Sequence, residues 1–102
     1  MEHFNKLTPA EAERLAILAE ECGEVIQAVG KILRHGYASC HPADVDLRLD
    51  NRNTLEKEIG DIQSAIAMMR EAGDISETNI AVSESKKRIT VVRYMHHYEG
   101  EK

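Results

Sequence analysis

Apolar side chains recur at every third or fourth position over two long stretches of the chain, a spacing that predicts amphipathic α-helices. The first predicted helix begins at Pro9, with Thr8 as its N-cap and Glu11 completing a capping box. It runs to about Arg34 and stops before Gly36. Its apolar side chains form one arc: Leu15, Leu18, Cys22, Val25, Ile26, Val29, Ile32 and Leu33.

Two further helices are predicted in the second half of the sequence. One starts near Asn53, with Glu56 three residues later, and ends at Gly73. The other has Ser76 as its N-cap and continues to Tyr98, although its many β-branched residues would also suit a strand. The apolar stripe of the middle helix consists of Leu55, Ile59, Ile62, Ala65, Ile66 and Met69.

An irregular segment separates the first two predicted helices. Residues 36–52 contain glycine, proline, serine, aspartate and asparagine, which favour turns over regular structure. The segment is long for a compact helical protein and is therefore a candidate functional element. With three helices and 102 residues, we predict a single all-α domain, residues 1–102, folded as a bundle of three main helices.

A stripe of small residues lies beside the apolar arc of the first helix: Ala12, Ala16, Ala19, Gly23 and Gly30. A glycine inside a helix costs about 1 kcal/mol relative to alanine. Close approach of another helix is the compensation that we predict for this cost. On the apolar side, Cys22 is predicted to be a buried, reduced thiol, and the two cysteines of the chain do not make a disulfide framework.

Charge and hydropathy exclude several classes of protein. The net charge is −5, with 30% charged residues, which argues against an electrostatic nucleic-acid binder. No run of about 18 apolar residues is present, so we expect no membrane span. The first residues lack the basic region and apolar core of a signal peptide. Together with the reduced thiols, these features predict a cytoplasmic protein.

The most informative residue is Glu58, an acid within the apolar stripe of the middle helix. Asp61 lies at the edge of that stripe, one turn further on. An acid is rarely buried without a partner, because an unpaired charge in apolar surroundings is costly. The first helix provides no cation at the corresponding place but offers more acids, with Glu21 and Glu24 repeating the same spacing of three residues. Glu20, beside them, is more exposed to the solvated side of the helix.

Four carboxylates that converge between two helices require a cation. Two like charges 4 Å apart repel by about 4 kcal/mol at an effective dielectric constant of 20. Oxygen ligands favour Mg²⁺, with Mn²⁺ as the alternative, over zinc, which prefers histidine and cysteine. A Mg²⁺ site that keeps open positions suits a phosphate substrate. The sequence therefore predicts a metal site between the first two helices.

The two acidic motifs also carry a family resemblance. Glu20-Glu21-Cys22-Gly23-Glu24 followed by Glu58-Ile59-Gly60-Asp61 resembles the EExxE and ExxD motifs of the all-α nucleoside triphosphate pyrophosphohydrolases, specifically the MazG-like branch. The resemblance covers roughly residues 8 to 72. The stretch from Val25 to Lys57 is longer than is usual in that family.

The resemblance implies an enzyme that cleaves nucleoside triphosphates between the α and β phosphates, giving monophosphate and pyrophosphate. It implies Mg²⁺ held by four acids, namely Glu21, Glu24, Glu58 and Asp61. Glu20 would be a further ligand or would orient the attacking water. Lys31, two turns beyond Glu24, and Lys87, in a basic run, are candidate phosphate contacts. Family members form dimers or tetramers, so we expect a homodimer or homotetramer whose assembly completes the site.

Three other functions remain open at this stage. The related phosphoribosyl-ATP pyrophosphohydrolases share the acidic pattern. A helical oligomerisation module with solvated acids would show no dependence on Mg²⁺. A regulator that binds nucleotides without turnover would keep the binding residues but release no pyrophosphate.

Overall fold

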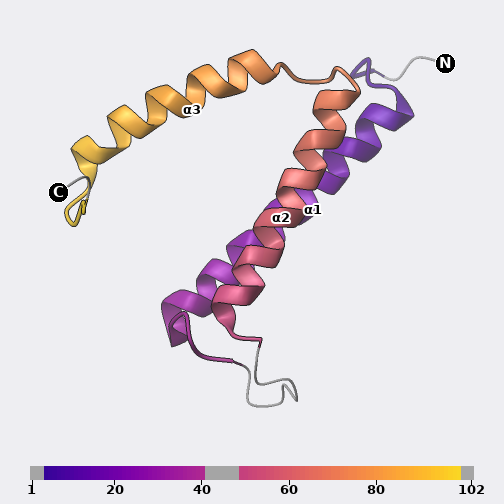
Figure 1. Ribbon diagram of the computed structural model, residues 1–102. Helices are drawn as coiled ribbons and strands as arrows, with labels where there is room; N and C mark the ends of the chain where they lie inside the picture. Colours follow the sequence, from indigo (N-terminus) through magenta and orange to yellow (C-terminus); the bar gives the residue numbers. More distant parts are fainter. Residues whose placement is uncertain (1–3, 41–48, 100–102) are drawn as a thin grey trace.

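The computed structural model describes residues 4–40 and 49–99, and this part of the chain contains helices and no strand. The elements are α1 (Pro9–His35), α2 (Asn51–Glu71), α3 (Glu77–Val91) and a short 3₁₀ helix, η1 (Val92–Tyr94). Figure 1 shows α1 and α2 side by side and antiparallel, with α3 leading away from them. The prediction of an all-α fold with three main helices is confirmed.

The hairpin of α1 and α2 contains the small core of the described residues. Ala28 of α1 and Ala65 and Met69 of α2 are the buried apolar residues there, each no more than 4% exposed. Two of these three residues are alanines, which allow helix axes to approach closely. The separation between α1 and α2 is therefore set by small side chains.

The ends of α1 agree with the capping signals in the sequence. The Thr8 hydroxyl accepts from the Glu11 backbone N–H at 3.1 Å, and the Glu11 carboxylate accepts from the Thr8 N–H at 2.8 Å. At the other end Gly36 has φ of 89° and its N–H donates to the Ile32 carbonyl at 2.6 Å. Glycine tolerates this positive φ, which explains why α1 ends there.

The start of α2 differs from the prediction. The helix begins at Asn51, with Asp50 as its N-cap, so Asn53 is inside the first turn. The Asp50 carboxylate accepts from the Asn53 N–H at 2.9 Å, and the Asn53 side chain accepts from the Asp50 N–H at 3.2 Å. Asparagine therefore takes the position that glutamate usually holds in a capping box. The helix therefore starts two residues before the predicted position near Asn53.

The third helix starts as predicted but ends early. The Ser76 hydroxyl accepts from the Asn79 N–H at 3.2 Å, as an N-cap does. The α-helix stops at Val91 and gives way to η1, so the prediction of one helix to Tyr98 was wrong. The β-branched residues of this segment have low helix propensity, which is consistent with the early end.

The two sides of the segment between α1 and α2 are joined by hydrogen bonds. The backbone N–H groups of Asn51 and Arg52 donate to the carbonyls of Ser39 and Tyr37 at 2.8 and 3.0 Å. The Arg52 guanidinium also lies 4.4 Å from the centre of the Tyr37 ring, a cation–π contact. Residues 41–48 lie outside the described residues, so the role of residues 36–52 as a functional element stays a prediction.

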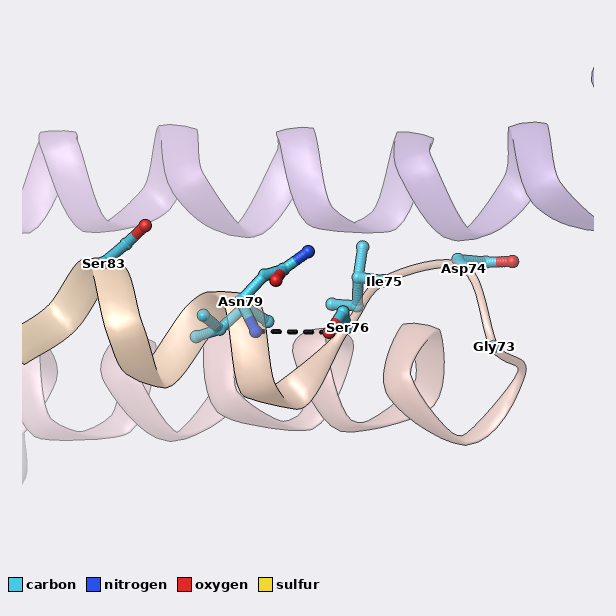
Figure 2. Close-up of a pocket in the computed structure, with 7 residues that line it drawn as sticks. Gly73, Asp74, Ile75, Ser76, Asn79 and Ser83 are labelled. Carbon is cyan, nitrogen blue, oxygen red and sulfur yellow. Dashed lines mark hydrogen bonds between the residues drawn. The ribbon is translucent and has the colours of Figure 1, made fainter.

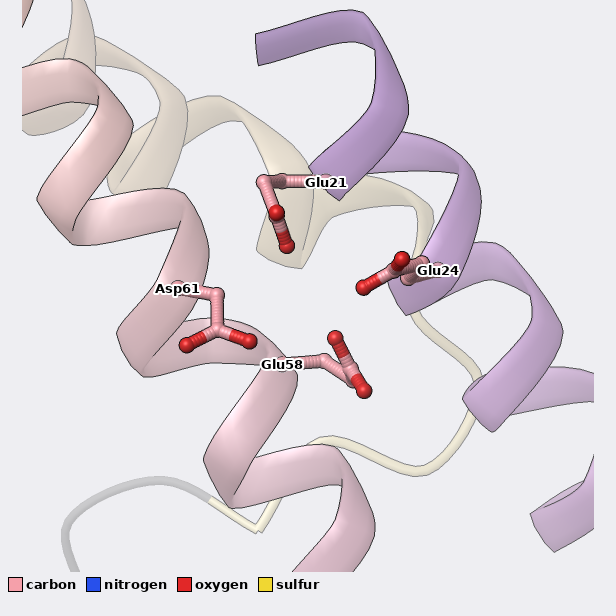
Figure 3. A group of neighbouring side chains, drawn as sticks. All are labelled: Glu21, Glu24, Glu58 and Asp61. Carbon is pink, nitrogen blue, oxygen red and sulfur yellow. The ribbon is translucent and has the colours of Figure 1, made fainter. Parts of the chain in front are cut away.

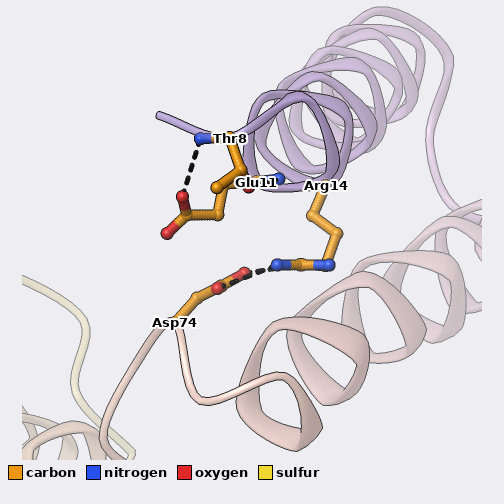
Figure 4. A network of polar contacts seen from close by, with 4 residues as sticks. All are labelled: Thr8, Glu11, Arg14 and Asp74. Atoms are coloured by element: carbon orange, nitrogen blue, oxygen red, sulfur yellow. Dashed lines mark hydrogen bonds and ion pairs between the residues drawn. The ribbon is translucent and has the colours of Figure 1, made fainter. Parts of the chain in front are cut away.

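An ion pair fixes the turn between α2 and α3. Arg14 of α1 donates to both carboxylate oxygens of Asp74 at 2.6 and 3.0 Å (Figure 4). Gly73, with φ of 80°, makes the turn immediately before Asp74. The pair ties the turn to the first half of α1, and α3 departs from this fixed point.

Every residue of helix α3 is exposed, and the described residues show no extensive packing of α3 on α1 or α2. The radius of gyration is 17.7 Å, whereas a compact domain of about 100 residues has about 13 Å. The apolar residues of α3 therefore have little cover within a single chain.

Two expectations about the outer face of α1 need correction. Cys22 is exposed, so the prediction of a buried thiol was wrong: the described part of the chain does not cover the apolar side on which it lies. A Cβ added at Gly23 or Gly30 would meet nothing within 4 Å, so no backbone of the described chain approaches them. Among the described helices, none is long and apolar enough to cross a membrane.

Candidate metal centre

Four acids from the two antiparallel helices converge at one place. Glu21 and Glu24 come from α1, and Glu58 and Asp61 come from α2 (Figure 3). Each offers one carboxylate oxygen, and these four atoms all lie within 4.8 Å of one another. A spacing of three residues puts both acids of a pair on one side of a helix, and the hairpin brings the two pairs face to face. No other acidic, histidine or cysteine group of this kind occurs among the residues that the structure describes.

Two of these carboxylates have oxygens that are shielded from water without a donor. Glu21 Oε2 and Glu58 Oε2 are buried and accept no hydrogen bond. The Glu58 side chain is only 12% exposed, whereas that of Asp61 is 40% exposed. A buried acceptor without a partner costs free energy, and native structures contain few of them. The two oxygens therefore indicate a cation-binding position at the closed end of the group.

The same crowding changes the acidity of Glu58. A hydrogen bond with Glu24 raises the pKa of Glu58 above its ordinary value, and burial and the charges of Glu24 and Asp61 act in the same direction. Lys57 opposes this shift through its positive charge. The raised pKa of Glu58 reflects the cost of bringing several carboxylate charges together in this group.

Lys57 is the residue at this centre that the sequence reasoning missed. Its ammonium Nζ lies 2.9 Å from Asp61 Oδ2 and 3.6 Å from Glu58 Oε1. The hydrogen bond with Asp61 is the main reason why the pKa of Lys57 is raised. The signal was visible in the sequence, because Lys57 precedes Asp61 by four residues on a predicted helix. Lys57 is mostly exposed, and its positive charge offsets the negative charge on the open side of the four acids. The buried oxygens of Glu21 and Glu58 still have no hydrogen-bond partner.

The donor set fits a hard divalent cation. All four ligand groups are carboxylates, without the sulfur or imidazole that zinc prefers. Opposite oxygens around an octahedral Mg²⁺ are about 4.2 Å apart, since each bond is about 2.1 Å. The 4.8 Å spread of the four oxygens is only slightly wider, so small side-chain rotations suffice to close the site.

Three residues predicted from the sequence lie outside this group. Glu20 is exposed on α1 and is not among the converging acids. Lys31 is exposed on α1, two turns beyond Glu24. Lys87 is exposed on α3, and the described residues show no extensive packing of this helix on α1 or α2. The structure therefore does not bring Lys87 to the acids of its own chain.

A separate hollow opens at the start of α3 and has a volume of about 760 Å³. Its lining consists of Gly73, Asp74, Ile75, Ser76, Asn79, Ile80 and Ser83. Figure 2 shows Ile75, Asn79 and Ser83 projecting to the same side. None of the four converging acids lines this hollow, and Asp74 is already paired with Arg14. The hollow lies where α3 leaves the hairpin, and its lining combines polar side chains such as Asn79 and Ser83 with Ile75 and Ile80.

Comparison with protein families agrees with the acidic centre. The model of the MazG nucleotide pyrophosphohydrolase domain matches residues 10–93, most of the chain, and the chain belongs to this family. The match extends past residue 72 and includes α3. Neither the comparison with curated proteins nor that with solved structures found a match. Family membership supports a nucleotide pyrophosphohydrolase, a hydrolase class that is typically metal-dependent.

Proposed function

We propose that this protein hydrolyses nucleoside triphosphates between the α and β phosphates, releasing monophosphate and pyrophosphate, with Mg²⁺ as its metal and Mn²⁺ as the alternative. The observation that carries the proposal is the convergence of four carboxylates with two buried, unpartnered oxygens. A cation would satisfy both oxygens and relieve the repulsion among the carboxylates that raises the pKa of Glu58. Family membership supplies the reaction class.

Each acid has a role in this proposal. Glu21, Glu24, Glu58 and Asp61 hold the metal, and their spacing across the hairpin fixes its position. The bound metal would polarise phosphoryl oxygens and neutralise charge on the leaving pyrophosphate. Glu20 is exposed beside Glu21, so it is free to orient an attacking water or to act as a further ligand.

Cations near the acids complete the proposed site. Lys57 already contacts Glu58 and Asp61, and its three N–H donors suit a phosphate that approaches from the open side. Lys31 lies on the same helix as Glu24 and is exposed. A phosphate contact by Lys87 requires a second copy, because α3 leaves its own hairpin. A homodimer or homotetramer is therefore part of the proposal.

Release of pyrophosphate from a panel of nucleotides tests this function. Canonical and modified nucleoside triphosphates are incubated with and without Mg²⁺, and the products are separated by chromatography. We expect equal amounts of monophosphate and pyrophosphate, only with metal. Phosphoribosyl-ATP belongs in the same panel, because its preferential cleavage would favour the related enzyme instead. Binding of nucleotide without any pyrophosphate would overturn the proposed hydrolysis.

A further inference from the structure

Among the described residues, Lys57 is the one cation that forms ion pairs with the four converging acids. Its Nζ donates to Asp61 Oδ2 at 2.9 Å and lies 3.6 Å from Glu58 Oε1. The side chains of Lys57 and Asp61 are 68% and 40% exposed, so this contact is on the open side of the acids. In the free protein, Lys57 is therefore a counter-ion for the two acids of α2.

The ammonium of Lys57 and a divalent cation would compete for the same carboxylates. Like charges a few Å apart repel strongly, even at an effective dielectric constant of about 20. The pair of Lys57 and Asp61 joins exposed positions four residues apart on one helix, and such pairs are weak. A metal that binds the four acids therefore displaces Lys57 from Asp61.

The displaced ammonium remains close to the acidic centre. Lysine carries its charge on a flexible four-carbon stem, and the stem of Lys57 begins one residue before Glu58. Its three N–H donors are then available to a negatively charged group on the open side. The phosphates of a nucleotide are such a group.

Lys31 differs from Lys57 in this respect. It is exposed on α1 about 10 Å beyond Glu24, at 1.5 Å per residue, and no ion pair joins it to an acid of the described residues. A metal at the acids therefore displaces Lys57 from a partner but not Lys31.

We infer that Lys57 couples metal binding to nucleotide binding: it is the counter-ion of Asp61 and Glu58 in the free protein and a phosphate ligand in the metal-loaded protein. The inference rests on the proposed function, because it takes metal and nucleotide as the ligands of this centre. Nucleotide alone has to separate Lys57 from Asp61, and metal alone leaves the ammonium without a counter-charge. The two ligands together remove both penalties, so each strengthens the binding of the other.

Calorimetric titration tests this coupling without turnover. The probes are Mg²⁺ and a nucleoside triphosphate analogue with a methylene bridge between the α and β phosphates. The coupling ratio is the Kd of the analogue without Mg²⁺ divided by its Kd with Mg²⁺. Any complex of Mg²⁺ with the analogue in solution contributes equally to every variant. A comparison of variants therefore isolates the contribution of the protein.

Lys57→Gln should lower the coupling ratio by about fivefold, the factor that an exposed ion pair contributes at most. Lys57→Arg keeps the positive charge and the ability to pair with Asp61, so it should keep most of the ratio. Lys31→Gln is the matched control for the loss of a nearby positive charge. Its coupling ratio should equal that of wild type, whatever its effect on each separate affinity.

The outcomes separate this inference from the proposed function. Equal coupling ratios for wild type and Lys57→Gln, in a protein that releases pyrophosphate with Mg²⁺, would overturn the inference and leave the function standing. A coupling ratio that depends on Lys57, in a protein that releases no pyrophosphate, would support the inference and refute the hydrolysis. A wild type that binds no Mg²⁺ would overturn both.

Discussion

Arg14 and Asp74 form a two-point ion pair between α1 and the turn that leads into α3. Arg14 Nε lies 2.6 Å from Asp74 Oδ2, and both side chains are largely shielded from solvent. The planar guanidinium of Arg14 makes two parallel hydrogen bonds with the carboxylate, so the pair fixes the relative orientation of the two side chains as well as their distance. It holds the α2–α3 turn against α1 and determines the point from which α3 leaves the hairpin.

This pair predicts a specific loss of stability in acid. The hydrogen bond with Arg14 lowers the pKa of Asp74 below its ordinary value of 3.8. Its stabilising effect is therefore complete above pH 3.8 and is lost as the pH falls through the lower pKa of the folded protein. Asp74→Asn should lower the melting temperature at pH 7, and the difference from wild type should shrink below that pKa. Glu71→Gln, an exposed acid nearby, is the control, and an equal effect of both variants would contradict the assignment.

Metal binding should raise the melting temperature, because a cation relieves the repulsion among the four acids only in the folded state. We expect millimolar Mg²⁺ or Mn²⁺ to stabilise the wild type and Glu58→Gln to weaken this response. Without metal the same variant should be as stable as wild type or more stable, since one repelling charge is gone. Calorimetry at low salt measures both effects. An unchanged melting temperature with metal would disprove the proposed metal site.

The increase in melting temperature that Mg²⁺ produces should become larger as the pH rises. The pKa of Glu58 is raised above its ordinary 4.5, so protons compete with metal for this carboxylate as the pH falls toward that raised pKa. Stabilisation by Mg²⁺ should therefore increase as the pH rises through this raised pKa. In Glu58→Gln the increase should be smaller.

The sequence was sufficient to predict the acidic centre because both of its determinants are local. The spacing of three residues places each pair on one side of its helix, and the apolar stripes determine how the helices face each other. Glu58 was informative because it is an acid inside such a stripe. Lys57 was missed because it lies outside the apolar stripe, although its spacing of four residues from Asp61 allows an ion pair on the helix surface.

The sequence could not predict what a single chain leaves uncovered. The apolar arc of α1 was interpreted as one face, but the structure divides it between a face on α2 and an exposed face that includes Cys22, Ile26 and Leu33. Cys22 was consequently misassigned to the interior. Apolar periodicity indicates that a surface is to be covered but does not specify whether the same chain covers it. The apolar residues of α3 show the same limit of sequence patterns: their spacing predicts a helix, but the described residues of α1 and α2 provide little packing for them.

Removal of any one of the four acids should abolish turnover while the fold survives. Glu21→Gln, Glu24→Gln, Glu58→Gln and Asp61→Asn should each lose at least about a hundredfold in rate, because charge stabilisation by the metal is lost. Glu13→Gln, exposed on α1, is the matched control and should stay near wild type. Circular dichroism confirms that each variant is helical. Equal rates for Glu13→Gln and Glu58→Gln would disprove the metal-binding roles proposed for the four acids.

Lys57 should act on metal and substrate in opposite directions. Its ammonium group pairs with Asp61 and Glu58, so it competes with a cation for these carboxylates. Lys57→Gln should bind Mg²⁺ more tightly in the absence of nucleotide, as titration calorimetry would measure. The same variant should have a higher KM for nucleoside triphosphate, because a phosphate contact is lost. Lys86→Gln, exposed on α3, controls for the loss of one positive charge. A lower affinity of Lys57→Gln for Mg²⁺ would contradict the competition.

The small buried residues should determine whether the acids can meet. Ala65 is 3% exposed and lies one turn after Asp61, and Ala28 is 4% exposed and lies one turn after Glu24. Ala65→Leu would force the helices apart at this level, and overpacking of this kind costs about 1–3 kcal/mol. The wider separation should also spread the four carboxylates beyond the reach of one cation.

We therefore expect Ala65→Leu to lower the melting temperature without metal and to lose most of the increase that Mg²⁺ produces. Gly60→Ala is the matched control, because it lies between Glu58 and Asp61 in the same helix and a Cβ there meets nothing within 4 Å. This change should stabilise α2 by up to about 1 kcal/mol through helix propensity, with the response to Mg²⁺ intact. If Ala65→Leu were destabilised but kept the full response, the spacing of the helices would not control the metal centre.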